Sequence, residues 1–290
     1  MGPFDLESAE KMAFERSYLF VPGDRPERFA KALASGADRV ILDLEDAVQP
    51  AAKDAAREAV LRWIGDRDDT VGSAVVIRIN GVDTPWHADD LAAFGAPSKA
   101  ISALMLPKAE SAEAVNAVRS DAVKPPVALI ETVAGLLRLR ELAKAGVERI
   151  AFGSVDFCVD AGIEGDDAEL DYVRTHLVLE SRLAGLPPPI DGVTLALHDA
   201  ERIRRDVERA RRFGFGAKLC IHPNQVSPVN VGFAPSVDEI AWAKGIVAAS
   251  EGSDGRGAIA VDGKLVDKPI LDRANRLIAR HTANSSPLGS

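Results

Sequence analysis

Two acidic residues stand at the ends of consecutive apolar runs in this sequence. Glu131 closes the run Val127–Glu131. Asp156 follows the run Ile150–Gly153 and lies 25 residues after Glu131. That is about one strand plus one helix, so a parallel sheet would bring both carboxylates to one edge. Neighbouring carboxylates resist ionising together unless a cation lies between them. Because no lysine obviously accompanies them, the pair indicates a Mg²⁺ site completed by water and substrate oxygens, although the spacing also allows ordinary salt bridging.

Arginine and further acidic residues end two earlier runs. Arg78 can bind a carboxylate through two parallel hydrogen bonds, which indicates an anion receptor. An ion pair with Asp43 or Glu45 on the neighbouring strand is equally consistent with the sequence. Glu45 and Asp46 could hold metal-bound water or simply balance the arginines, and we favour the first interpretation.

The histidines give a weaker signal. His222 ends another run and could act as a general base, but a lone histidine before proline is more often structural. The others, His87, His176, His198 and His281, show no zinc-ligand spacing. Neither a P-loop nor a dinucleotide-binding glycine loop is present, so nucleotide binding of those kinds is unsupported.

Composition excludes several classes of protein. The 290 residues are 47% hydrophobic and carry a net charge of −9 without a basic block, which argues against nucleic acid as a partner. No apolar run approaches the roughly 20 residues of a membrane helix, and the N-terminus lacks the pattern of a secretion signal. Cys158 and Cys220 are far apart and are expected to be buried thiols in a reducing compartment. We therefore expect a cytoplasmic protein with no membrane association.

The elements that must position these residues alternate between β-branched runs and amphipathic stretches, about 30 residues per pair. This rhythm is typical of βα units and predicts an α/β fold, a closed (β/α)8 TIM barrel, whose reactive groups lie where the strands end. The expected strands are Tyr18–Pro22, Val40–Leu44, Ala74–Ile79, Ala103–Pro107, Val127–Glu131, Ile150–Gly153, Ile190–Val193 and Ala217–His222. Clear helix patterns cover Arg25–Ala34, Lys53–Ile64, Ala168–Leu183, Asp199–Phe213 and Ser236–Ala249.

The composition shifts after the last of these helices. A linker-like stretch, Ser250–Gly257, leads to a short strand-like piece, an Asp-Gly turn and a helix. We therefore expect a barrel catalytic domain over 15–249, a linker and C-terminal segment over 250–281, and a disordered tail over 282–290.

At the charged residues that end the expected strands, the sequence resembles the citrate lyase β-subunit-like branch of the HpcH/HpaI aldolase superfamily. This branch includes malyl-CoA and citramalyl-CoA lyases. The resemblance runs from Ser17 to about Ala279, nearly the whole chain. It is carried by the colinear blocks SYLFVPGDRPERFAKA, RVILDLEDAV, VIRIN, LMLPKAE, ALIET, IAFGSVDF, DGV, AKLCIHPNQ and VDGKLVDKP.

The resemblance implies a (β/α)8 barrel, a homotrimer or hexamer, and Mg²⁺ held by the residues at Glu131 and Asp156. It implies that Arg78 grips the carboxylate of a keto acid. Arg25 and Lys31 fall in the block where related lyases contact the CoA phosphates.

A C-terminal segment of family members covers the active site of a neighbouring subunit. The acid/base aspartate of that segment matches Asp267. Here it lies in Leu-Val-Asp-Lys-Pro, where the family has a Met-Ile-Asp-Met-Pro-like motif, so the departure concerns substrate fit more than acid/base capacity.

The expected activity is Mg²⁺-dependent cleavage or formation of a carbon–carbon bond in a CoA thioester. The substrate would be of malyl-CoA, citramalyl-CoA or citryl-CoA type, and the products acetyl- or acyl-CoA and oxaloacetate, glyoxylate or pyruvate. Two alternatives remain open: a malyl-CoA-type thioesterase on the same scaffold, and a citryl-carrier-protein lyase subunit of a citrate lyase complex.

Overall fold

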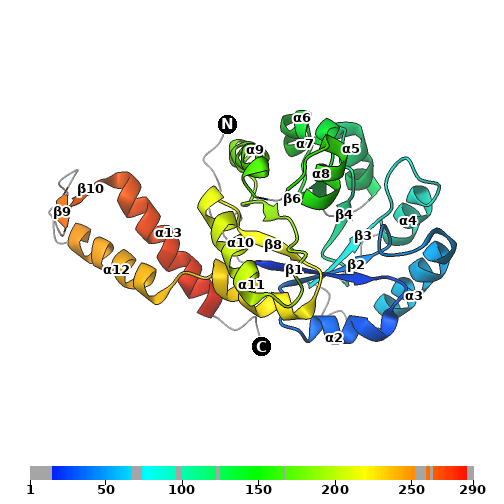
Figure 1. Cartoon of the computed structure of the whole chain (residues 1–290), viewed down its shortest axis with the longest axis horizontal. Helices are drawn as coiled ribbons and strands as arrows, with labels where there is room; N and C mark the ends of the chain where they lie inside the picture. Colours follow the sequence, from blue (N-terminus) through cyan, green and yellow to red (C-terminus); the bar gives the residue numbers. More distant parts are fainter. Residues whose placement is uncertain are drawn as a thin grey trace. The chain divides into compact units, whose positions relative to one another are not determined.

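The computed structural model describes residues 15–66, 74–95, 100–121, 125–165, 167–251, 259–261 and 264–285. The chain divides into two compact units, Met1–Asn230 and Val231–Ser290. The first unit contains a closed barrel of eight parallel strands in sequential order, which confirms the expected fold class (Figure 1). Its strands are β1 (Ser17–Pro22), β2 (Arg39–Asp43), β3 (Val75–Arg78), β4 (Ala103–Leu106), β5 (Val127–Ile130), β6 (Arg149–Phe152), β7 (Ile190–Asp191) and β8 (Ala217–Cys220).

Helices follow the strands and lie outside them (Figure 1). They are η1 (Pro26–Arg28), α2 (Phe29–Leu33), η2 (Pro50–Ala52), α3 (Lys53–Gly65), α4 (His87–Phe94), α5 (Ala112–Asp121), α6 (Val133–Leu137), α7 (Leu139–Lys144), α8 (Ser154–Ala161), η4 (Ala168–Leu170), α9 (Asp171–Leu183), α10 (Ala200–Phe213), η5 (Pro223–Gln225) and α11 (Val226–Phe233). Several strands end one to two residues before the expected limits, because the chain turns into loops at the barrel mouth.

Side-chain alternation explains which residues point into the barrel. Successive side chains of a strand face opposite sides, so the inward positions recur every second residue. The interior is filled by side chains including Ile41, Val76, Leu129 and Ala151, all almost fully buried. Asp43, Arg78 and Glu131 each lie two residues after one of these inward side chains, namely Ile41, Val76 and Leu129. The alternation therefore places three charged side chains above a packed apolar interior.

The second unit is a small helical assembly with its own core. It begins at Val231, within the last turn of α11. It then comprises α12 (Val237–Glu251), the antiparallel pair β9 (Ile259–Val261) and β10 (Lys264–Val266), and α13 (Lys268–Ser285). Apolar residues of α12 and α13, among them Ile240, Ala243, Ala274 and Leu277, form one buried cluster. The helix expected at Ser236–Ala249 thus packs with α13 in this unit, and Ser236 caps it by accepting the Glu239 N–H as expected.

The expected tail and linker fall partly outside the description. Residues 252–258 of the linker and 286–290 of the tail lie outside the described residues, and α13 continues to Ser285, four residues into the segment expected to be disordered. The functional division into catalytic domain, lid and tail stays a prediction.

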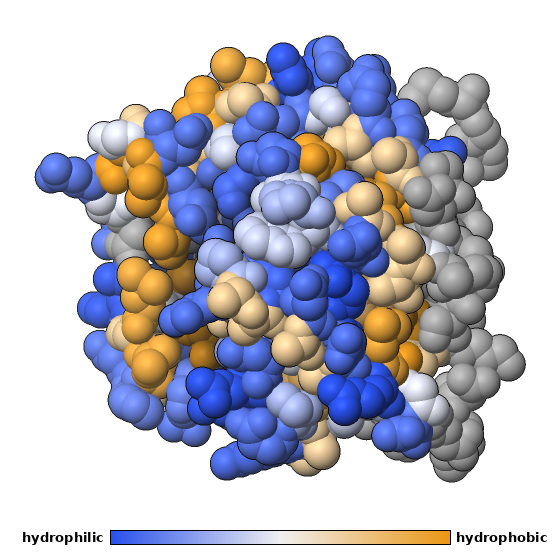
Figure 2. All heavy atoms as spheres, turned by 90° about the vertical axis from the view of Figure 1, so that its right-hand side faces the viewer, coloured by the Kyte–Doolittle hydropathy of each residue, from blue (hydrophilic) through white to orange (hydrophobic). Residues whose placement is uncertain are grey.

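The surface is mixed. Figure 2 shows hydrophilic side chains over the centre of one face and hydrophobic ones in separate patches toward its edges. Mostly exposed apolar side chains include Leu137 at the end of α6, Val159 on α8 and Leu179 on α9. Among the described residues, none of the helices is long and apolar enough to cross a membrane. Of the two cysteines expected to be buried, Cys220 is, whereas Cys158 on α8 is only half-buried.

Candidate active site

A pocket of about 400 Å³ opens at the carboxyl end of the barrel strands. Its lining combines acidic and basic side chains with apolar ones, so it can hold a charged group next to apolar surface. Its lining residues are Phe20, Asp43, Asp46, Ala47, Arg78, Leu129, Glu131, Phe152, Gly153, Ser154, Val155, Asp156, Val193, Leu219 and Ile221. Arg78, Glu131, Asp156 and Asp46, all expected from the sequence, are therefore brought together.

Arg78 is buried and held side-on by its neighbour in the sheet. Arg78 on β3 lies directly opposite Asp43 on β2 in the strand register. Its Nε and Nη2 donate to the two Asp43 carboxylate oxygens at 2.7 and 2.6 Å. The guanidinium also lies 4.9 Å above the ring of Phe20. Burial alone would lower the pKa of Arg78, but the charges of Asp43 and Glu45 outweigh it and raise that pKa. The guanidinium is permanently charged and fixed in orientation.

The ion pairs considered from the sequence are both present. Besides Asp43, the Arg78 Nη1 lies 2.8 Å from Glu45 Oε2 and 3.5 Å from Asp46 Oδ2. Glu45 is buried, whereas Asp46 is about half exposed. A guanidinium has five N–H groups, and Asp43 takes two, so pairing within the protein does not exhaust its capacity to bind a carboxylate.

Glu131 is a deeply buried carboxylate of the pocket, only 1% exposed. Its Oε1 accepts the backbone N–H of Lys108 at 2.7 Å, whereas its Oε2 is buried without a hydrogen-bond partner. Burial, followed by the negative charge of Glu45, raises the pKa of Glu131 to about 8, and Asp156 contributes in the same direction. An unpaired buried carboxylate oxygen facing a pocket is a strong indication of a missing positive partner.

Gly153 makes the position of Glu131 possible. A Cβ at Gly153 would lie 2.5 Å from the Glu131 Cβ and 2.7 Å from its Oε2. Because the first of these atoms is fixed to the backbone, any side chain at Gly153 would displace the carboxylate. Asp156, three residues later in the first turn of α8, is exposed and lines the same pocket.

The donor set fits a hard divalent cation. Five carboxylates (Asp43, Glu45, Asp46, Glu131 and Asp156) outnumber the cations Arg78 and Lys108. Among the described residues, no three His, Cys, Asp or Glu side chains are arranged around a single metal position. Two carboxylates with open positions suit Mg²⁺, which retains waters and substrate oxygens, and suit zinc poorly.

Lys108 follows an expected strand, but the sequence predicted no role for it in the site. Its Nζ donates to Glu45 Oε1 at 2.7 Å while its N–H contacts Glu131. The sequence suggested no lysine near the acidic pair, and this is wrong. Burial alone would lower the pKa of Lys108, but the hydrogen bond and charge of Glu45, and then the charge of Glu131, raise it. The available signal was its place directly after a strand end, within the block LMLPKAE.

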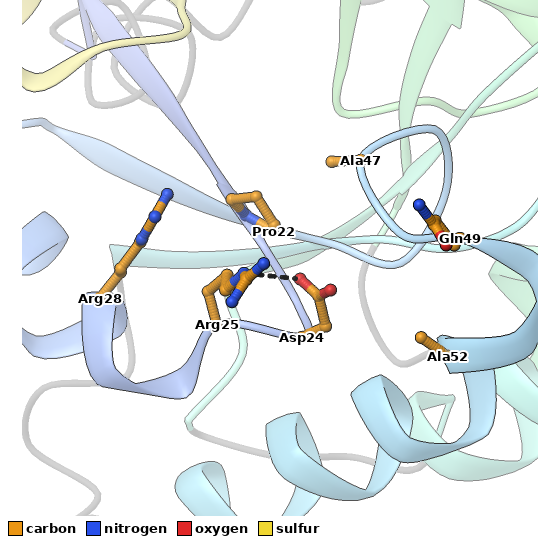
Figure 3. A pocket seen from close by; sticks show the side chains of 7 residues that line it. All are labelled: Pro22, Asp24, Arg25, Arg28, Ala47, Gln49 and Ala52. Carbon is orange, nitrogen blue, oxygen red and sulfur yellow. Dashed lines mark ion pairs between the residues drawn. The ribbon is translucent and has the colours of Figure 1, made fainter.

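A second pocket of about 460 Å³ adjoins the first and shares Ala47 with it. Figure 3 shows Arg25 meeting Asp24, with Arg28 projecting from η1 and Gln49 and Ala52 on the opposite side. The Arg25 Nε lies 3.8 Å from Asp24 Oδ1, a loose pairing that leaves both arginines able to bind an anion. Lys31 on α2 is exposed and does not line this pocket.

Two further residues have clear structural roles. Asp267 precedes α13, and its Oδ1 accepts the Ile270 N–H at 3.3 Å, as a helix cap does. His222 caps η5 through its Nδ1, which accepts the Asn224 N–H, and its ring meets that of His198 edge-on. The structural interpretation of His222 is therefore supported by the contacts.

Comparison with known proteins defines the class. The family model for HpcH/HpaI aldolase/citrate lyase matches residues 16–223. This chain belongs to the HpcH/HpaI aldolase/citrate lyase family and has its closed α/β barrel.

Similar proteins span nearly the whole chain. A citrate lyase subunit beta-like protein of Mycobacterium tuberculosis is 38% identical, covering 91% of this chain and 94% of its own. A (3S)-malyl-CoA thioesterase of Cereibacter sphaeroides is 34% identical, covering 92% and 95%. The crystal structure of CitE from M. tuberculosis in complex with magnesium, acetoacetate and coenzyme A superimposes with a TM-score of 0.81 at 35% identity, covering 93% of this chain and 99% of that one.

Proposed function

We propose that this protein is a Mg²⁺-dependent carbon–carbon lyase acting on a hydroxyacyl-CoA thioester of malyl-, citramalyl- or citryl-CoA type. It would release an acyl-CoA and a 2-keto acid, or join them in reverse. The observation that carries the proposal is the buried, unpartnered Oε2 of Glu131 in a pocket that also presents Asp156 and Arg78. Structures of M. tuberculosis relatives holding magnesium with pyruvate or oxaloacetate support it.

Glu131 and Asp156 would hold the metal, with Glu45 and Asp46 orienting its waters. The ion would supply Lewis acidity, stabilising negative charge on the substrate's hydroxyl oxygen, which is attached to a carbon of the bond that breaks. The chain's own contribution is a fixed pair of carboxylates: Glu131 is positioned by the Lys108 N–H and by the absence of a side chain at Gly153.

Arg78 would bind the substrate's carboxylate. Asp43 holds its guanidinium side-on and so fixes the direction of the remaining N–H groups. Two parallel hydrogen bonds from these groups orient a carboxylate better than a lysine could. The apolar lining residues Phe20, Leu129 and Phe152 would exclude water from the reacting carbons.

The reaction needs one proton removed and one supplied. In cleavage, the hydroxyl loses its proton, its carbon becomes the keto carbon, and the electron pair of the broken bond passes to the thioester α-carbon. We assign both transfers to Asp267 of a neighbouring subunit: its carboxylate would accept the hydroxyl proton and return that proton to the α-carbon. The departure of Val266 and Lys268 from the family motif affects the surroundings of this acid, not its chemistry.

The second pocket would receive the phosphates of CoA. Arg25 and Arg28 line it, and it shares the lining residue Ala47 with the first pocket. We assign Lys31 to the outer edge of this phosphate site, because its α2 helix follows directly after Arg28.

The assembly would be a cytoplasmic homotrimer or hexamer, because the proposed lid requires a second copy. Exposed apolar side chains such as Val159 (80% exposed) and Leu179 (62%) offer surface for self-association.

A thioesterase is the second candidate, favoured by the 34% identity to the (3S)-malyl-CoA thioesterase. Both activities would use the same metal and Arg78; they differ in whether water attacks the thioester carbonyl. The distinguishing products are free CoA with an intact hydroxy acid for a thioesterase, and an acyl-CoA with a keto acid for a lyase.

One assay tests the proposal. The purified protein is incubated with Mg²⁺ and a panel of 2- and 3-hydroxyacyl-CoA thioesters, and products are identified by mass spectrometry. We expect an acyl-CoA and a keto acid from at least one thioester, and no turnover in EDTA. Metal-independent turnover would contradict the proposal, and exclusive release of free CoA would favour the thioesterase. Turnover only of a carrier-protein thioester, in the presence of other subunits, would indicate a citrate lyase subunit.

A further inference from the structure

A left-handed turn lies beside the pocket, at the end of β4. Lys108 has φ = 43°, and among the described residues it is the one non-glycine residue with a positive φ. Side-chain-bearing residues rarely adopt this conformation, which glycine takes without strain. Such backbone outliers concentrate at functional sites, where neighbouring contacts hold them in place.

Contacts on both sides fix the turn. The Lys108 N–H donates to Glu131 Oε1 at 2.7 Å, and the next N–H, of Ala109, donates to the Leu129 carbonyl at 3.2 Å. The Ala109 carbonyl lies so close to Gly135 of α6 that a Cβ there would be 2.6 Å from it. The left-handed conformation is thus what directs the Lys108 N–H at the Glu131 carboxylate.

The side chain of Lys108 reaches the opposite way, to Glu45 after β2. Its Nζ donates to Glu45 Oε1 at 2.7 Å. The other oxygen, Oε2, lies 2.8 Å from Arg78 Nη1 but accepts no hydrogen bond. The Nη1 hydrogens are therefore not directed at Glu45, although the two charged groups touch. The hydrogen bond from Lys108 to Oε1 holds the Glu45 carboxylate in this orientation.

We propose that Lys108 is a positioning residue with two functions: its N–H orients Glu131, and its ammonium holds Glu45 so that Arg78 keeps N–H groups free for the substrate carboxylate. The inference rests on the proposed function, in which Arg78 is the carboxylate receptor. Lys108 itself does not line the pocket, so it acts through Glu131, Glu45 and Arg78.

The side-chain function is tested with Lys108→Met, which keeps the length of the side chain and removes its charge. Pyruvate is titrated calorimetrically into Mg²⁺-loaded protein without any CoA compound. Because Glu45 would then accept the Arg78 N–H groups, we expect pyruvate to bind at least about tenfold more weakly. Lys144→Met, an exposed lysine in the last turn of α7, is the matched control and should leave pyruvate affinity unchanged.

A second background separates positioning from general stabilisation. In Glu45→Gln, the neutral amide competes weakly for Arg78, so adding Lys108→Met should weaken pyruvate binding less than about threefold. An equal loss in both backgrounds, or Lys108→Met binding pyruvate within twofold of the wild type, would overturn the side-chain function.

The backbone function is tested by two variants that lack the charge equally. Lys108→Gly adopts the left-handed turn freely, whereas the β-branched side chain of Lys108→Val disfavours it. We expect the valine variant to bind Mg²⁺ at least about tenfold more weakly than the glycine variant, measured by titration calorimetry on proteins with matching circular dichroism. Equal Mg²⁺ affinities would overturn the backbone function.

Failure of this inference is distinct from failure of the proposed function. If wild-type protein binds pyruvate with Mg²⁺ and Lys108→Met does likewise, only the role of Lys108 is overturned. If the wild type binds no pyruvate in the presence of Mg²⁺, the assignment of Arg78 and the metal pair is itself overturned.

Discussion

At the scale of single residues, the site depends on the carboxyl group of Glu131, whose ionised form is disfavoured by its surroundings. Glu131 is buried beside Glu45 and Asp156, and its pKa is raised to about 8. Without a cation, the pocket therefore favours the protonated form at neutral pH. A metal ion requires the ionised form, so metal binding and deprotonation are coupled.

This coupling predicts proton release. At pH 6.5, Mg²⁺ binding should release about one proton per site, and above pH 9 close to none, because Glu131 is then already ionised. Calorimetry in two buffers of different ionisation enthalpy measures the number released. Glu131→Gln should bind Mg²⁺ at least about 100-fold more weakly. No proton release at pH 6.5 would contradict the coupling between metal binding and deprotonation of Glu131.

The same shift predicts how metal-free stability depends on pH. Glu131 in the unfolded chain titrates near its ordinary pKa of about 4.3, so between that value and about pH 8 the folded state holds the extra proton. Stability of the metal-free protein should therefore fall as pH rises through this range, by about 5 kcal/mol. Thermal unfolding in EDTA measures it, and Glu131→Gln should remove this part of the slope. An unchanged slope in that variant would contradict the assignment.

At the scale of elements, the barrel positions the site through side-chain alternation and close backbone approach. The inward positions of β2 and β3 continue as Asp43 and Arg78, adjacent in register, which makes their ion pair a consequence of the fold. The turn from β6 into α8 passes so near Glu131 that only glycine fits at residue 153.

Gly153→Ala therefore tests the element-level argument. The added Cβ should displace Glu131, lower Mg²⁺ affinity at least about tenfold and destabilise the fold by about 1 to 3 kcal/mol. Gly65→Ala, at the end of α3 where a Cβ meets nothing within 4 Å, is the control and should be neutral or slightly stabilising. Calorimetric Mg²⁺ titration and thermal unfolding give both results. If the two alanine variants behaved alike, Gly153 would have no special role.

The sequence predicted the barrel and most of the pocket because both follow from periodicity. Runs about 30 residues apart specify βα units, and charged residues at their ends must meet at one mouth, as Arg78, Glu131 and Asp156 do. Lys108 and Arg28 were missed for a physical reason. In the sequence, a lysine after a strand or an arginine on a short helix resembles any solvated surface residue. The sequence pattern predicts neither the left-handed φ of Lys108 nor the pocket that Arg28 lines. The packing of α12 with α13 likewise depends on contacts between distant residues.

At the scale of the whole molecule, the net charge of −9 opposes an anionic substrate. Local cations must overcome it, and distant charges are screened over roughly 8 to 10 Å, so a metal ion with Arg78 can dominate its own pocket. The proposed acid/base residue, Asp267, belongs to the second compact unit, and the proposal places it over another subunit's barrel.

Subunit mixing tests that placement. Glu131→Gln and Asp267→Asn should each reduce turnover at least about 100-fold. If Asp267 acts in a neighbouring subunit, mixed oligomers of the two variants contain some sites with both residues intact, and activity should return to a substantial fraction of the wild type. Activity is measured after co-expression of the two variants. No recovery, with mixed oligomers verified by mass spectrometry, would contradict action between subunits.

The most direct test of the central claim is to locate the metal. Crystals grown with Mn²⁺ in place of Mg²⁺, together with pyruvate, give an anomalous signal that identifies the ion. We predict a peak about 2.1 Å from carboxylate oxygens of both Glu131 and Asp156, with the pyruvate carboxylate on Arg78. A peak elsewhere, or density for pyruvate with no ion between those carboxylates, would contradict the account.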